Sequence, residues 1–358
     1  MRKLEEEFVP RMIASGPVVQ GDEFTVSAIG LDHGHIYGQT RFLKDAGARV
    51  KQVWDPDPEK VKKFQEVFPE VTIAKDKREI LEDDEVRMVV AATVSADRSD
   101  LGIEVMRAGK DYFTDKPAFT TLDQVKAARE VVAETGRKYM IYYSERLCYE
   151  SSTFAGQLVK AGVIGRVLQV LGLGPHRLNA ASRPEWFFQK ERYGGILCDI
   201  GSHQAEQFLF FSEAKEAKVV YSAVANHQHR DLYPELEDFG EANVVGDNGT
   251  TGYFRVDWFT PGGLRSWGDG RTIILGTDGM IELRKNMDLG TDNGGDQLLL
   301  ATHVGEARYA VKGKIGFPFF GQLILDCLNR TELAMTQEHA FRASELALEC
   351  QANAQRIE

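Results

Sequence analysis

The stretch FTVSAIGLDHGHIYGQT, residues 24–40, decides how the first half of the chain folds. It begins with an apolar run that ends at Gly30, which predicts a buried strand followed by a tight turn. Dinucleotide-binding folds open in this way, with the pattern G-x-G-x-x-G between the strand and the next helix. Here Asp32 takes the place of the second glycine and His35 that of the third. The stretch is therefore either a modified nucleotide-binding loop or a metal-binding D-H-x-H loop.

The rest of the first half predicts alternating strands and helices. Short apolar runs recur at residues 26–29, 50–54, 87–92, 112–114 and 139–143. Several are continuous rather than alternating, which is typical of parallel strands buried on both faces. Asp57-Pro58 and the capping box Thr121-x-x-Gln124 mark the starts of two intervening helices. We predict an α/β, doubly wound Rossmann domain over residues 23–145, preceded by an extension at residues 1–22.

The second half, residues 146–358, predicts a different α/β domain. A helix near residues 152–161 leads to a strand at 167–173, and two helical patterns end the chain at 318–330 and 338–356. Asn248-Gly249 and Asp278-Gly279 are typical hairpin turns, and each stands between two strand-like segments. This domain is expected to contain an antiparallel sheet.

Composition excludes some classes of partner. The net charge of −11 argues against nucleic acid or an anionic membrane as a partner, because both bind basic surfaces. Four scattered cysteines without a C-x-x-C pair favour a reducing, cytoplasmic location. The sequence lacks a long apolar run of the kind that predicts a membrane span.

Two acidic residues follow the second predicted strand. Asp55 stands 25 residues after Gly30, where a carboxylate can bind the adenosine ribose. Asp57 would further repel a 2′-phosphate, which favours NAD over NADP, although it is better explained as a helix cap. Zinc is the second interpretation: Asp32, His33 and His35, with His227-x-His229 elsewhere, are zinc-type ligands. No motif supplies the further ligands such a site needs, so we predict no metal.

Two separated motifs carry the candidate chemistry. Lys116, in DYFTDKPAF, follows a predicted central strand and belongs at the carboxyl edge of the sheet, where such folds bind ligands. Asp199 and His203, in YGGILCDIGSHQAEQF, are four residues apart and would share one face of a helix. A carboxylate beside an imidazole orients the ring and raises its basicity for acid–base work. Each motif alone is as easily structural as catalytic.

Taken together, the motifs resemble those of the glucose–fructose oxidoreductase / inositol dehydrogenase (Gfo/Idh/MocA) family, from about residue 26 to the C-terminus. Asp115-Lys116-Pro117 looks like the family's E-K-P. Gly194-Gly195-x-x-x-Asp199-x-Gly201-x-His203 looks like its G-G-x-x-x-D-x-G-x-H. The resemblance implies a Rossmann domain followed by an α/β domain with an open, predominantly antiparallel sheet. That sheet often joins subunits, which implies a homodimer or homotetramer.

The resemblance also implies NAD(P)-dependent oxidation or reduction of a sugar, cyclitol or related polyol. In that role His203 is the general base, Lys116 polarises the substrate oxygen, and Asp199 orients His203. The expected cofactor-binding residues are Gly30, Asp32, His33, His35, Asp55, Thr93, Asp115 and Lys116. The expected substrate-binding residues are Lys116, Asp199 and His203, with candidates His176, Arg177, Asn179, Arg183 and Trp186 from the polar-aromatic stretch before the glycine pair.

Three departures from the family pattern leave alternatives open. Asp115 replaces the usual glutamate, Arg98 stands where many members have histidine, and the glycine fingerprint is degenerate. An NAD-dependent glycosidase on the same scaffold would use the same lysine, aspartate and histidine. A non-catalytic NAD-binding or sensor protein would keep the fold without the chemistry.

Overall fold

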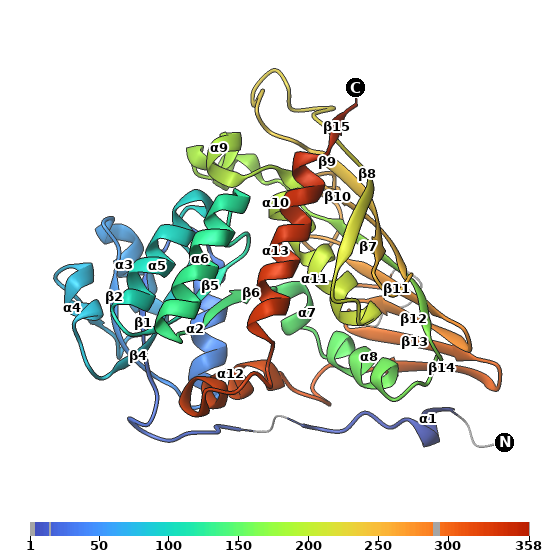
Figure 1. Cartoon of the computed structure of the whole chain (residues 1–358), viewed down its shortest axis with the longest axis horizontal. Helices are drawn as coiled ribbons and strands as arrows, with labels where there is room; N and C mark the ends of the chain where they lie inside the picture. Colours follow the sequence, from blue (N-terminus) through green and yellow to red (C-terminus); the bar gives the residue numbers. More distant parts are fainter. Residues whose placement is uncertain (1–3, 14–15, 289–293, 358) are drawn as a thin grey trace.

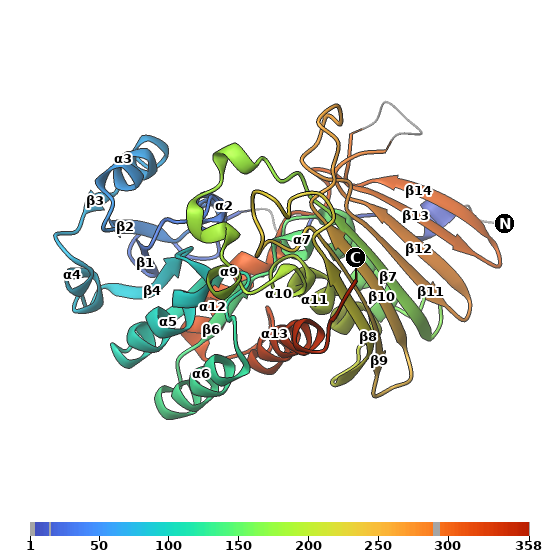
Figure 2. The same ribbon diagram turned by 90° about the horizontal axis from the view of Figure 1, so that it is seen from above.

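The computed structural model describes residues 4–13, 16–288 and 294–357. Two sheets stand side by side, with helices between them (Figures 1 and 2). The first sheet has six parallel strands in the order β3-β2-β1-β4-β5-β6. Its strands are β1 (Thr25–Ile29), β2 (Arg49–Trp54), β3 (Thr72–Ile73), β4 (Val86–Ala91), β5 (Asp111–Asp115) and β6 (Tyr139–Tyr142). This is the predicted doubly wound α/β sheet, whose order reverses between β1 and β4.

Five of these strands match the predicted apolar runs, whereas β3 was missed. Both residues of β3 are exposed, so no apolar run marks it. The helices around this sheet are α2 (His35–Asp45), α3 (Pro58–Val67), α4 (Lys77–Leu81), η1 (Ser95–Asp97), α5 (Arg98–Arg107) and α6 (Leu122–Thr135). The capping box is confirmed at α6, because Thr121 accepts from the Gln124 backbone and the Gln124 side chain accepts in return.

The second sheet has nine strands in the order β14-β13-β12-β11-β7-β10-β9-β8-β15. All neighbours are antiparallel except β7 with β10 and β8 with β15, so the expected predominantly antiparallel sheet is confirmed. Both predicted hairpins form, as β9–β10 and β11–β12. The strands are β7 (Val167–Pro175), β8 (Ala217–Ala225), β9 (Phe239–Gly246), β10 (Thr251–Asp257), β11 (Arg271–Gly276), β12 (Gly279–Arg284), β13 (Gln297–Thr302), β14 (Gly305–Ala310) and β15 (Gln355–Arg356).

Helices cover the face of this sheet that looks toward the first domain (Figure 2). They include α8 (Glu150–Lys160), α11 (Gly201–Ser212) and α13 (Gln337–Ala352). The segment between β7 and α11 is irregular and holds only short helices. These are η2 (Ala180–Ser182), η3 (Glu185–Phe188), α9 (Lys190–Tyr193) and α10 (Ile196–Asp199), while α7 (Ser144–Leu147) follows β6.

The two ends of the chain tie the domains together. The N-terminal segment runs below both domains in Figure 1: α1 (Leu4–Glu7) meets β14, where the Tyr309 hydroxyl donates to the Leu4 carbonyl at 3.1 Å. Near the other end, α12 (Pro318–Asn329) packs on α2 of the first domain. Phe320 stacks on Phe42 with ring centroids 4.5 Å apart. Residues after 146 therefore help to cover the first sheet, although the domain boundary near residue 145 itself stays a prediction.

Among the described residues, no helix is long and apolar enough to cross a membrane.

The Phe320 contact predicts a stability effect. Phe320 is 1% exposed, so Phe320→Ala should lower the free energy of unfolding by about 3–5 kcal/mol, from lost burial and the cavity left behind. Leu328 on the same helix is 42% exposed, and Leu328→Ala should change the free energy of unfolding by no more than about 0.5 kcal/mol. Urea unfolding followed by tryptophan fluorescence measures both. Equal effects would contradict the packing of α12 on α2.

Candidate active site

The turn after β1 fits a nucleotide despite its missing glycines. Gly30 has φ +78°, and a Cβ there would lie 2.8 Å from the Cβ of Thr93, so a larger residue would clash and close the turn. A groove of about 390 Å³ opens here, lined by Gly30, Asp32, Asp55 and Thr93 among others. It lies at the carboxyl ends of β1 and β4, where the strand order reverses and such folds bind ligands.

Asp32 is the residue that most opposed a nucleotide site. Its carboxylate accepts a hydrogen bond from Lys60 Nζ at 2.6 Å and another from Thr93 Oγ1 at 3.1 Å. The ammonium group offsets the negative charge that would otherwise repel a diphosphate. An ion pair between Asp32 and Lys60 thus stands where the fingerprint has its second glycine.

Asp55 lies at the tip of β2 and lines the same groove. Its two carboxylate oxygens accept backbone N–H groups, from Leu31 at 2.6 Å and from Asp57 at 2.9 Å. Burial raises the pKa of Asp55, although these two hydrogen bonds oppose the shift. Asp57 caps α3 by accepting from the Glu59 backbone at 2.9 Å, as the simpler interpretation predicted.

The Asp115 carboxylate connects the loop to the lysine motif. It accepts from His33 Nδ1 at 2.9 Å and from His35 Nδ1 at 2.8 Å, and it also lies 3.3 Å from Arg98 Nη2. One of its oxygens accepts the backbone N–H of Lys116 at 2.8 Å. The charges of these neighbours hold the pKa of Asp115 well below its usual value, in spite of complete burial, which acts in the opposite direction.

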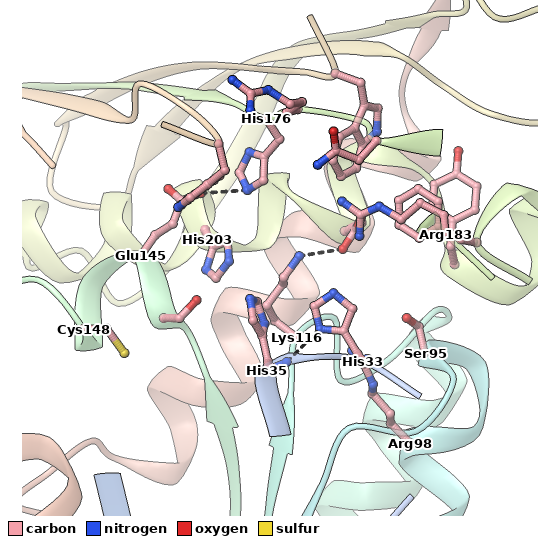
Figure 3. Close-up of a pocket in the computed structure, with 18 of the residues that line it drawn as sticks. His33, His35, Ser95, Arg98, Lys116, Glu145, Cys148, His176, Arg183 and His203 are labelled. Carbon is pink, nitrogen blue, oxygen red and sulfur yellow. Dashed lines mark hydrogen bonds and ion pairs between the residues drawn. The ribbon is translucent and has the colours of Figure 1, made fainter. Parts of the chain in front are cut away.

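Lys116 and Asp199 meet across the two domains. Lys116 Nζ donates to Asp199 Oδ1 at 2.6 Å, and both side chains are nearly buried. Figure 3 shows Lys116 and His203 directed into one pocket, which both residues line. The residues predicted to carry the chemistry are therefore brought together from separate halves of the chain.

The expected role of Asp199 needs a correction. It was predicted to orient His203, yet its carboxylate pairs with Lys116, and the buried Nδ1 of His203 has no hydrogen-bond partner among the residues the structure describes. The physical reason is electrostatic, because a buried carboxylate pairs more strongly with an ammonium group than with a neutral imidazole. Asp199 ends α10 and His203 lies in the first turn of α11, and Ile200 between them keeps helical backbone angles, so the four-residue spacing did not decide which partner the carboxylate takes.

Burial keeps the imidazoles of His203, His176 and His33 neutral. Burial, reinforced by the charge of Lys116, holds the pKa of His203 well below its usual value. Burial also lowers the pKa of His176 to about 4 and that of His33 to about 4. A neutral imidazole can accept a proton, so His203 is in the form that a general base needs.

The pocket has a volume of about 440 Å³ and aromatic walls. All five candidates from the stretch before the glycine pair line it: His176, Arg177, Asn179, Arg183 and Trp186. Sequence reasoning missed Glu145, Trp258 and Trp267. Glu145 follows β6 as Lys116 follows β5, so the strand-end rule that found the lysine could also have found it. Both tryptophans lie in the segment that follows β10, and no motif marks them as pocket residues.

The loop histidines also bear on the metal interpretation. His33, His35 and Asp115 place three possible ligand atoms within 4.8 Å of one another, so the third ligand that the sequence did not supply is Asp115. However, Arg98 and the Lys116 N–H occupy the same carboxylate, and a divalent cation would lie against the guanidinium. His229 belongs to a separate site, where its Nδ1 lies 3.0 Å from Asp238.

Comparison with known proteins identifies the family. Residues 25–143 match the model described as "Oxidoreductase family, NAD-binding Rossmann fold", and residues 153–282 match the GFO/IDH/MocA C-terminal domain. The chain belongs to the Gfo/Idh/MocA family of oxidoreductases. The expected fold and enzyme class are thereby confirmed.

Several individual proteins are similar to this family member. The scyllo-inositol 2-dehydrogenase (NAD(+)) of Bacillus subtilis is 25% identical over 258 residues, which are 69% of this chain and 70% of that protein. The D-xylose dehydrogenase of Paenarthrobacter nicotinovorans is 24% identical over 210 residues, 57% of this chain and 52% of that protein. A crystal structure of a proposed oxidoreductase from Erwinia carotovora atroseptica is 47% identical, with a TM-score of 0.91 over 94% of this chain and all of that one.

The lowered pKa of His176 predicts a pH effect on stability. The unfolded chain protonates this imidazole near pH 6.5, whereas the folded protein keeps it neutral down to about pH 4. Protons therefore favour the unfolded state, and stability should fall as the pH drops from 6.5 toward 4. His176→Asn, which cannot titrate, should lose less stability over that range, as measured by thermal unfolding at several pH values. A parallel loss in the variant and the parent would contradict this burial effect.

Proposed function

We propose that the protein is an NAD-dependent dehydrogenase of a sugar, cyclitol or related polyol. The observation that carries the proposal is the 2.6 Å contact of Lys116 with Asp199, in one pocket with a neutral, buried His203. The names of the similar scyllo-inositol and D-xylose dehydrogenases support this class of substrate.

The first domain would hold the cofactor. Gly30, Asp32, Asp55 and Thr93 line the groove suited to the adenosine and diphosphate. His33 and His35, fixed by Asp115, lie beside Lys116 at the reacting end. NAD, when bound, supplies the hydride acceptor, and the protein supplies position and electrostatics.

His203 and Lys116 would act on one substrate hydroxyl. His203 takes the hydroxyl proton on its imidazole as the carbinol is oxidised. Lys116 Nζ donates a hydrogen bond to the same oxygen and stabilises the negative charge that develops there. Asp199 holds the Lys116 amine in place through this contact, so it acts as a positioning residue for Lys116.

The second sheet would join subunits in a homodimer or homotetramer. Leu275 and Met280 are cross-strand neighbours on its outer face, and their side chains are 44% and 38% exposed. Contiguous exposed apolar residues are typical of subunit contacts. The cytoplasmic location stays a prediction based on the four free cysteines.

The role of His203 predicts a loss of turnover. His203→Asn should lower kcat for NAD reduction by about 10²–10⁴-fold, because the positioned base is lost. The Kd for NAD should change by no more than about twofold, since His203 lies outside the adenosine groove. A panel of cyclitols, pentoses and hexitols gives the substrate, and the exposed His303→Asn is the control.

Two results would contradict this mechanism. Release of nitrophenol from glycosides without net NADH would favour the glycosidase. If His203→Asn kept the kcat of the parent, as the control His303→Asn should, His203 would have no part in the chemistry.

The carboxylate of Asp55 predicts a preference for NAD over NADP. A 2′-phosphate beside Asp55 would meet a like charge, so NAD should bind at least about tenfold more tightly. NAD at ~100 times its Kd should stabilise the protein by about 2.7 kcal/mol, which thermal unfolding detects. Asp55→Asn should narrow the difference between the two cofactors. Tighter binding of NADP by the parent would show that Asp55 does not set this preference.

A further inference from the structure

One cation in the pocket has few hydrogen-bond or ion-pair partners in the protein itself. Arg183 lines the pocket, and its guanidinium carbon lies 4.5 Å from the ring centre of Phe187 and 5.1 Å from that of Trp258. Its Nε donates to the Leu178 carbonyl at 3.0 Å, and within the described part of the chain this is the only hydrogen bond of the side chain. Figure 3 shows Arg183 among the side chains that line the pocket, and its Nη1 and Nη2 make no hydrogen bond to the described residues.

Three other cations, in or behind the pocket wall, face carboxylates. Lys116 pairs with Asp199 at 2.6 Å, as described above. Arg98 lies 3.3 Å from Asp115. Behind the pocket wall, Lys285 lies 3.8 Å from Glu145. Arg183, by contrast, lies close enough to Asp199 to interact with it but has no carboxylate within 4 Å among the described residues.

Arg177 does not play the same part. It also lines the pocket, but its Nη2 donates to the carbonyls of Pro261, Leu264 and Ser266, which fix it to the rim loop. Arg183 has no comparable set of acceptors, and burial lowers its pKa, so keeping it charged costs free energy. A cation held in this way is best explained by an anionic ligand.

The form of the site indicates a carboxylate. A guanidinium that rests on aromatic rings presents its edge in a fixed plane, which matches the two oxygens of a carboxylate. A single guanidinium fork pairs with the two oxygens of one carboxylate, so a monoanion satisfies both terminal nitrogens of Arg183. The remaining walls, including Trp186 and Trp267, offer flat apolar surface for the carbon skeleton.

We propose that the substrate is a sugar acid, an aldonate or uronate, whose carboxylate binds Arg183 while its reacting hydroxyl lies between Lys116 and His203. This rests on the proposed dehydrogenase function and narrows it to a substrate class. The carboxylate takes no part in the oxidation, so Arg183 determines specificity and orients the substrate.

Matched pairs of compounds test the proposal on the full-length protein. D-glucuronate with D-glucose, D-galacturonate with D-galactose, and D-gluconate with D-glucitol differ chiefly in the acid group. NADH formation gives kcat/KM, and calorimetry in the presence of NAD gives Kd independently. For at least one pair, the acid should be favoured by roughly 10- to 100-fold in kcat/KM or Kd, as expected of a charge-assisted hydrogen bond.

Variants assign the preference to Arg183. Arg183→Gln should abolish it, and Arg183→Lys should keep part of it, since lysine retains the charge without the planar fork. Arg265→Gln, on an exposed arginine of the rim loop, is the matched control and should keep the full preference. If Arg183→Gln fails to fold, the preference of the parent and its partial loss in Arg183→Lys still decide.

The outcomes separate this inference from the function beneath it. Neutral sugars oxidised as well as or better than the acids, a preference that survives Arg183→Gln, or no binding of any acid would overturn the inference. Tighter binding of glucose 6-phosphate than of the acids would overturn it in favour of a phosphate site. If only neutral polyols are oxidised, the dehydrogenase function is supported and the acid site is not. If acids bind in an Arg183-dependent way but no NADH forms, the acid site is supported and the dehydrogenase function is not.

Discussion

The buried ion pair of Lys116 with Asp199 is the constraint on which the site depends. Lys116 directly follows β5 of the first domain, and Asp199 ends α10 of the second. Their 2.6 Å contact therefore depends on the relative position of the two domains. Burying two charges is costly, and removal of one partner from such a pair typically destabilises a protein by about 3–5 kcal/mol. Stability alone therefore does not explain the pair, whereas the need to fix the Lys116 side chain beside the cavity does.

Asp115 extends this constraint back to the opening loop. It binds both loop histidines and the Lys116 backbone, so the residues that depart from the glycine fingerprint also position the lysine. A shorter carboxylate in place of glutamate fits this arrangement, because Arg98 and the two imidazoles approach it closely. Arg98, which stands where many family members have histidine, shares the Asp115 carboxylate with the two loop histidines. Asp32 is likewise offset, by Lys60.

Much of this was predictable from the sequence, and the rest failed for identifiable reasons. The alternation of strands and helices, the hairpins and the capping box follow from local patterns, whereas β3 has no apolar run to reveal it. The motifs placed Lys116, Asp199 and His203 in one pocket, but a four-residue spacing could not show that Asp199 turns away from His203 toward the lysine. The Asp115 contacts and the aromatic walls join segments distant in sequence, and neither spacing nor periodicity carries that information. Glu145 was within reach of the strand-end rule and was overlooked.

The central claim is that this one pocket joins the cofactor, the lysine of the first domain and the histidine of the second. A crystal structure of the protein soaked with NAD tests it most directly. The account predicts adenosine along Gly30 and Asp55, with the nicotinamide beside Lys116 and facing the cavity that His203 lines. A metal ion held by His33, His35 and Asp115, or a nicotinamide directed away from Lys116, would contradict it.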